Sequence, residues 1–107
     1  AAKEVSNKPA TSKAIIFGGS GQGEAMQANR YPKVRAAVYY GGPEDIVTLS
    51  RQHNDANVLS IGARFVTIDK AKEIIWAWLH TEALADEKYH RRNVKIDRIT
   101  PHDSEAE

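Results

Sequence analysis

The sequence predicts an α/β domain built on a parallel, doubly wound, Rossmann-like sheet. Three apolar segments, residues 14–17, 34–40 and 57–62, have the length and composition of strands. Helical segments lie between and after them, and this alternation is typical of parallel sheets with right-handed crossovers. A chain of 107 residues is long enough for one such domain and too short for two.

The first half of the chain contains two of the expected strands. Residues 1–6 are expected to be the end of a helix, and residues 14–17 are continuously apolar, as in a buried strand. A helix over residues 24–29 should stop before Pro32, because proline disfavours helical backbone in the residue that precedes it. Residues 34–40 form the second strand.

The third strand, residues 57–62, follows a helix with a clear start signal. Gly41-Gly42-Pro43 places a proline in the first helical turn, and Glu44 and Asp45 complement the positive end of the helix dipole. This helix is expected to run to about Gln52.

Two further helices are expected, over residues 69–80 and 86 to about 99. Ile75, Trp78 and Leu79 are expected on one face of the first of these helices. Trp76 lies two positions from Trp78, so the two indoles cannot face the same core, and we expect one of them to contact a partner subunit. The second helix is basic, and the acidic residues 100–107 after it are expected to form a flexible tail.

Composition restricts the possible functions. An apolar content of 41% with 27% charged residues fits a globular protein outside the membrane, and a net charge of +1 gives no electrostatic reason to expect nucleic acid or an anionic membrane. The chain has no cysteine, which excludes disulfides, thiolate metal sites and a cysteine nucleophile. The histidines have no metal-ligand spacing, so we expect no metal or cofactor, and we expect a cytoplasmic location.

The most distinctive segment is the glycine-rich stretch over residues 18–24, Gly-Gly-Ser-Gly-Gln-Gly-Glu, directly after the first strand. Backbone N–H groups in such a turn suit an anion. A phosphate cradle would carry a lysine at its exit, where this chain has Glu24. A carboxylate beside N–H donors is what proton abstraction next to a carbonyl requires: a base, and donors for the oxyanion that forms.

Two nucleotide motifs fail at this loop. The G-x-G-x-x-G dinucleotide pattern fits neither from Gly18 nor from Gly19, and Glu24-Ala25 replaces the Lys-Ser/Thr of a Walker A loop. A plainer interpretation stays open, in which the glycines make a tight turn and Glu24 complements the helix dipole. Ligands of doubly wound sheets bind at the carboxyl ends of strands, and Gly62-Ala63-Arg64 follows the third strand there.

Three ordered motifs resemble the type B ribose-5-phosphate isomerases, whose relatives include galactose-6-phosphate isomerase subunits. They extend over most of residues 1–99. The first joins the glycine-rich stretch to residues 28–30 and 34–37, the second is residues 53–64, and the third is Tyr89-His90-Arg91-Arg92 with Val94-Lys95-Ile96.

The resemblance implies isomerisation of a phosphorylated sugar, ribose 5-phosphate to ribulose 5-phosphate, through an enediolate. One branch of the family uses a cysteine at the position of Gly18, and another uses the glutamate that matches Glu24, as this chain would. The oxyanion would be held by Ser20 and by the loop residues Gly19, Gly21, Gln22 and Gly23.

The resemblance also implies a phosphate site and a sugar contact. The implied phosphate ligands are His53, Arg64, Lys88 and Arg92, and Asn54 would contact the sugar. Lys88 stands where an arginine is more usual, and it lacks the bidentate fork of arginine. Plainer roles remain open: His53 as a helix-end residue, Arg64 as a surface cation, and the basic helix as a solvated face.

The resemblance further implies that residues 1–99 are a partial domain. Family members begin with an additional strand–helix–strand unit, so the strand over residues 14–17 is expected to have an unpaired edge. We expect a homodimer or higher homo-oligomer, in which Lys88 and Arg92 meet His53 and Arg64 of a partner at one phosphate. The alternatives are a phosphate- or nucleotide-binding module without catalysis and an inactive subunit of an assembly.

Overall fold

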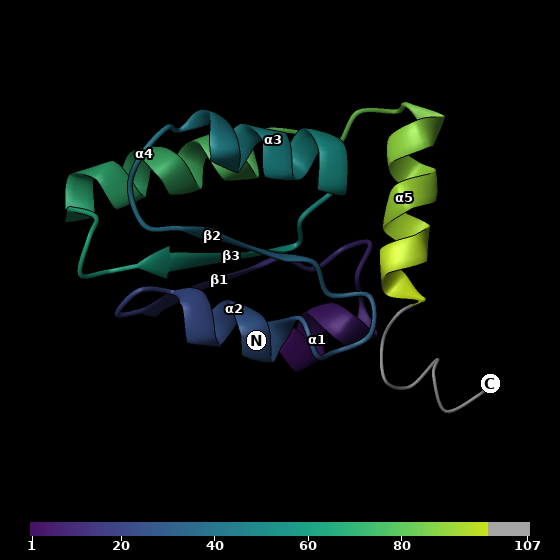
Figure 1. Ribbon diagram of the computed structural model, residues 1–107, viewed down its shortest axis with the longest axis horizontal. Helices are drawn as coiled ribbons and strands as arrows, with labels where there is room; N and C mark the ends of the chain where they lie inside the picture. The colour runs from purple at the N-terminus through teal and green to yellow at the C-terminus, as the bar shows by residue number, and fades with distance from the viewer. Residues whose placement is uncertain (99–107) are drawn as a thin grey trace.

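The computed structural model describes residues 1–98, which form a three-layer α/β domain (Figure 1). The acidic tail expected over residues 100–107 lies outside the described residues. The elements, in chain order, are α1 (Ala2–Asn7), β1 (Ala14–Gly18), α2 (Gln22–Ala28), β2 (Ala36–Tyr39), α3 (Asp45–Asn54), β3 (Val58–Gly62), α4 (Ile68–Leu79) and α5 (Glu87–Asp97). None of the helices in this part of the chain is long and apolar enough to span a membrane.

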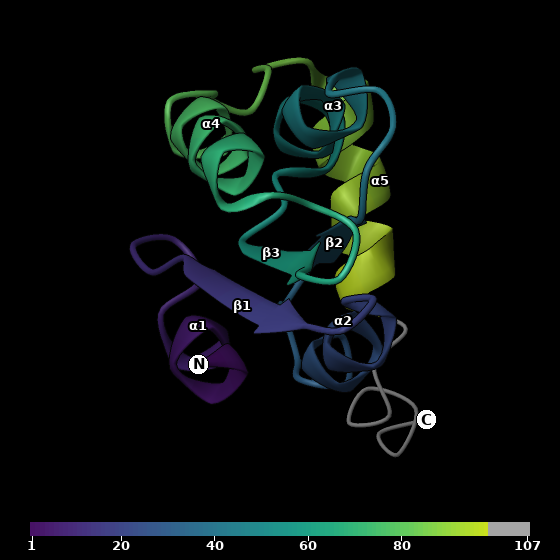
Figure 2. The same cartoon turned by 90° about the vertical axis from the view of Figure 1, so that its left-hand side faces the viewer.

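The sheet confirms the predicted class. Its three strands are parallel in the order β1-β3-β2, so β3 is central and all five of its residues are buried. Helices α1 and α2 cover one face, and α3 and α4 cover the other (Figure 2). A sheet with helices on both faces buries its strands on both sides, which explains their continuous apolar runs.

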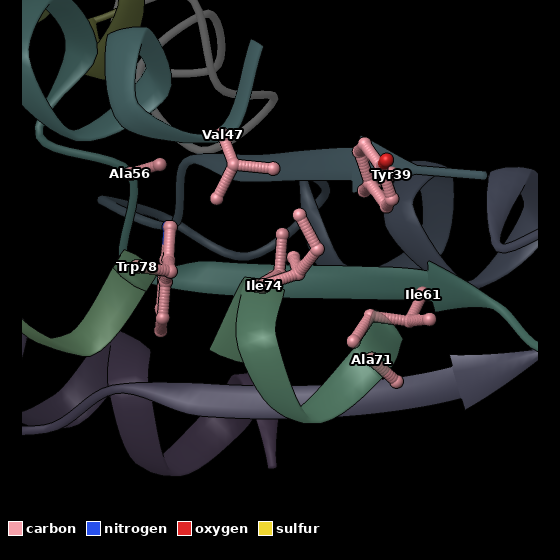
Figure 3. Close-up of a cluster of buried hydrophobic side chains, with 8 residues drawn as sticks. Tyr39, Val47, Ala56, Ile61, Ala71, Ile74 and Trp78 are labelled. Carbon is pink, nitrogen blue, oxygen red and sulfur yellow. The ribbon is translucent and has the colours of Figure 1, made fainter. Parts of the chain in front are cut away.

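Two apolar cores hold the layers together. The larger lies between the sheet and α3 and α4, where Val47 and Ile74 pack with Ile61 of β3 (Figure 3). The smaller lies on the opposite face and joins Val5 of α1 to Val58 of the sheet. Helix α5 stands outside both layers at one end of the sheet and packs against α3 (Figure 1).

The structure corrects several boundaries. The second strand is shorter than residues 34–40, because the Arg35 N–H donates to the Asn57 side chain before the ladder begins. Helix α2 starts at Gln22 instead of Glu24, directly after the left-handed Gly21. Helix α3 continues past Gln52 to Asn54.

The buried face of α4 also differs from the expectation. Ala71, Ile74 and Trp78, at spacings of three and four residues, form that face, while Ile75 is half-buried and Leu79 is 47% exposed. The prediction that the two tryptophans diverge is confirmed: Trp78 is fully buried, and Trp76 is 64% exposed and stacks on His80. Contact of Trp76 with a partner stays a prediction.

The two edges of the sheet differ in their hydrogen bonding. On β2, the Asn29 side chain accepts from the Ala36 N–H at 2.7 Å and donates to its carbonyl at 3.3 Å, and so occupies the place of a neighbouring strand. On β1, Ala14 and Gly18 bond toward β3, which turns the backbone groups of the alternate residues Ile15 and Phe17 outward. The expected unpaired edge of the first strand is therefore present within residues 1–98.

We predict that the two tryptophans contribute very differently to stability. Trp78→Ala should lower the free energy of unfolding by about 3–5 kcal/mol, because it empties the centre of the larger core. Trp76→Ala, the matched control two positions away, should lower it by less, because this side chain is 64% exposed within the chain. Urea unfolding followed by circular dichroism measures both values, and equal losses would contradict the assigned core.

Candidate active site

The glycine-rich loop follows β1 at a point where the connections after two neighbouring strands leave the sheet on opposite faces. β1 leads into α2 on one face of the sheet, whereas β3 leads into α4 on the other (Figure 2). Beyond the strand ends the two loops stay joined, because the Ala63 N–H donates to the Gly18 carbonyl at 2.7 Å and the Arg64 N–H to that of Gly19 at 3.0 Å. In doubly wound sheets this switch point is where ligands bind.

The loop is held in one shape by a buried hydroxyl. Ser60 of β3 is fully buried, and its Oγ donates to the Gly21 carbonyl at 2.7 Å. Gly21 has φ 78°, and a Cβ there would lie 3.1 Å from the Gly62 nitrogen. The loop therefore requires glycine at position 21. The exposed Ser20 hydroxyl oxygen accepts the Gln22 N–H at 3.3 Å, so it lies over the start of α2.

Glu24 occupies the space that a side chain on Gly18 would fill. A Cβ built on Gly18 would collide with the Glu24 carboxyl group, so this carboxyl lies directly against the end of β1. Glu24 is exposed, and it lines an open groove of about 450 Å³ with Ile16, Phe17 and Tyr31. The carboxylate thus lies against the end of β1 and borders a groove that runs between α1 and α2.

Arg64 places a positive charge at the same loop. Its guanidinium lies alongside Gly19, where an added Cβ would be 3.2 Å from Nε. Arg64 is exposed and is the second residue after β3. The first cluster therefore combines the Glu24 carboxylate, the loop amides and the Arg64 cation.

The remaining predicted residues form a second cluster at the opposite end of the sheet. Helix α3 runs from the carboxyl ends of the strands back to their amino ends, so His53 and Asn54 in its last turn lie there. The His53 ring stacks on Tyr89 of α5 with centroids 4.3 Å apart, and Lys88 Nζ lies 5.0 Å from the centroid of the same tyrosine. Arg92 follows Lys88 by one turn on this helix and is exposed.

The structure thus separates residues that the sequence grouped together. His53 lies with Lys88 of its own chain, and Arg64 lies with the glycine loop instead of with His53. Five strand residues separate the two ends of β3, a length of about 17 Å, so one chain does not bring the clusters together. Sequence analysis quoted Tyr89 within the third motif without a role and did not single out Asn93; their spacing of one helical turn beside Lys88 is the signal that could have found them.

No group of three His, Cys, Asp or Glu side chains within residues 1–98 could hold a metal ion. The two clusters supply a carboxylate, backbone N–H donors and cationic side chains. At the first cluster these groups suit proton transfer next to a carbonyl, and at the second they suit an anion such as phosphate.

Comparison with known proteins gives consistent matches. The family model described as Ribose/Galactose Isomerase matches residues 1–96. Ribose-5-phosphate isomerase B of Escherichia coli is 43% identical over 65 residues, which are 61% of this chain and 42% of that protein. The corresponding Mycobacterium tuberculosis protein is 35% identical over 78 residues, 73% of this chain and 47% of its own length.

Solved structures agree with these matches. Type B ribose 5-phosphate isomerase from Trypanosoma cruzi superposes with a TM-score of 0.84 at 35% identity, over 92% of this chain and 63% of that chain. The Mycoplasma genitalium enzyme with bound ribulose-5-phosphate gives 0.83 at 33% identity, over 91% and 62%. The chain spans about half the length of the curated relatives named above. The chain belongs to the ribose/galactose isomerase family, together with the type B ribose-5-phosphate isomerases.

Proposed function

We propose that this chain carries the catalytic base of an enzyme that interconverts ribose 5-phosphate and ribulose 5-phosphate. The observation that supports this most directly is the Glu24 carboxyl, which lies against Gly18 at the start of the glycine-rich loop and borders a groove. The match to a relative solved with bound ribulose-5-phosphate supports the choice of substrate.

The proposed chemistry is a proton shuttle. Glu24 takes the proton from C2 of the open-chain aldose, and the C–H electron pair forms a C1–C2 double bond while negative charge develops on O1. The loop N–H groups and the Ser20 hydroxyl stabilise that oxyanion. Glu24 returns its proton to C1 as O1 gains a proton and the C2 hydroxyl loses one, which leaves the ketone at C2.

We further propose that the phosphate binds to the second cluster of a partner subunit. Within one chain, His53 and Lys88 lie at the opposite end of the sheet from Glu24. A dimer in which the second cluster of each subunit meets the first cluster of the other would complete two equivalent sites. Arg64, on the glycine loop, would then meet the same phosphate from the Glu24 side.

We also propose that a further parallel strand pairs with β1 and completes the wall of the groove. Such a strand would cover the outward-facing backbone groups of β1 and the Phe17 side chain, which is 57% exposed. The openness of the Glu24 groove favours one alternative, an assembly subunit that binds phosphate without turning substrate over. The variants below distinguish the two functions.

Glu24→Gln should lower the rate of isomerisation by about 10²–10⁴-fold, because the amide cannot accept the C2 proton. The assay follows ribulose 5-phosphate formation by the native polypeptide that contains these residues. Binding of ribose 5-phosphate should persist, as measured by calorimetry. Glu82→Gln, at an exposed glutamate between α4 and α5, is the control. Unchanged turnover in Glu24→Gln would refute the assigned base, and binding without turnover in the unmodified protein would favour the alternative.

Gly18→Ala should reduce the rate by about 10²-fold, because the new methyl group displaces the Glu24 carboxyl from its seat. The colliding atoms are the end of a flexible side chain, so the free energy of unfolding should change little. The double variant with Glu24→Gln should be no slower than Glu24→Gln alone, since both changes act on one group. Multiplicative losses in the double variant would show that Gly18 does not act through Glu24.

Mixing two inactive variants tests the shared site. Glu24→Gln and Arg92→Ala subunits, unfolded and refolded together, should regain about a quarter of the normal activity, because each hybrid dimer contains one intact site. Each variant refolded by itself is the control. If activity does not return although mass spectrometry detects hybrids, Glu24 and Arg92 do not serve one site from different subunits.

A further inference from the structure

The end of α3, which carries His53 and Asn54, is held by donors from other parts of the chain. The last carbonyls of a helix have no partner within it. Here the Gln52 carbonyl accepts the Leu84 N–H at 3.0 Å, and the Asn54 carbonyl accepts Arg35 Nε at 2.8 Å. The carbonyl between them, that of His53, accepts the side-chain amide of Asn93 on α5 at 3.1 Å.

Asn93 bonds to both neighbouring residues at once. Its Nδ2 donates to the His53 carbonyl, and its Oδ1 accepts from the Asn54 side chain at 3.2 Å. Asn93 is 8% exposed and is the buried residue of α5. Both halves of this amide are used, so its orientation is fixed and it fixes the amide of Asn54 in turn.

Tyr89 precedes Asn93 by one turn and holds the His53 ring. The two rings are nearly parallel, at 16°, and their centroids are 4.3 Å apart. Lys88 Nζ lies 5.0 Å from the centroid of the same tyrosine, close enough for a cation–π interaction. One aromatic ring thus contacts both an imidazole and an ammonium group.

We propose that Tyr89 and Asn93 are positioning residues, which orient His53, Asn54 and Lys88 for a sugar phosphate without touching it. This inference rests on the proposed function of the second cluster. Stacking removes rotational freedom from the His53 ring before the ligand arrives, and binding then loses less entropy. The pair also fixes α5, whose other side chains are exposed or half-buried, against the end of α3.

Variants at position 89 separate positioning from folding. Tyr89→Phe keeps the ring, whereas Tyr89→Leu keeps an apolar side chain and removes the stack. The readout is the ring-proton NMR signal of His53, assigned with His53→Gln, during titration with ribose 5-phosphate. The native polypeptide and Tyr89→Phe should show a ring-current shift of His53 and equal affinities. Tyr89→Leu should lose the shift and bind about three- to tenfold more weakly.

Asn93→Asp supplies an independent measurement. The carboxylate still accepts from Asn54 but cannot donate to the His53 carbonyl, so affinity should fall by a similar factor while the turnover number at saturation stays the same. If Tyr89→Leu and Asn93→Asp lower the melting temperature but leave the His53 signal and the affinity unchanged, both residues are merely structural and the proposal is wrong. If the unmodified protein binds no ribose 5-phosphate, the proposed function fails, and the ring-current shift still decides whether Tyr89 holds His53.

Discussion

The pairing of β1 with β3 is the constraint on which the candidate active site depends. The two strands run in register from Ala14 and Val58 to Gly18 and Gly62, and backbone hydrogen bonds continue the pairing into the loops that follow. Those bonds fix the path of the glycine loop, and the buried Ser60 hydroxyl fixes its turn. The path of the main chain at Gly18, which has no side chain, leaves the space that the Glu24 carboxyl group occupies. The chemistry of the site therefore follows from a ladder of main-chain contacts more than from contacts between side chains.

The opposite end of the sheet is organised by a different requirement. The end of α3 leaves carbonyl groups that must find donors, and α5, Arg35 and the connection after α4 supply them. Nη1 of Arg35 also donates to both carboxylate oxygens of Asp97, at 2.9 and 3.0 Å, near the end of α5. Satisfying these polar groups places Tyr89 of α5, and with it Lys88, at His53. One end of the domain thus carries the Glu24 carboxylate with Arg64, and the other carries His53 and Lys88, as the proposed site shared between two subunits would need.

Much of this arrangement could be predicted from the sequence. The unbroken apolar run before Gly18 identified a strand, and the glycines with Glu24 located the first cluster, because local composition carries both signals. The strand order β1-β3-β2 could not be predicted, since nothing local specifies which strands become neighbours. The predicted inward face of α4 was wrong at Leu79. Ile74 lies on the buried face instead, because it is spaced by three and four residues from Ala71 and Trp78. Asn93 was missed for a related reason: its partners lie about 40 residues away in the chain.

The seat of the Glu24 carboxyl has a consequence for how such sequences can change. A side chain at residue 18 and a carboxylate from residue 24 compete for one volume, so the two positions cannot vary independently. A lineage that acquires a bulkier residue at position 18 displaces the carboxylate, and under the proposed mechanism it keeps its activity only if the new residue takes over the proton transfer. The two forms of the site are therefore separated by an epistatic barrier, and an aligned set of related sequences should show strong covariation between these positions.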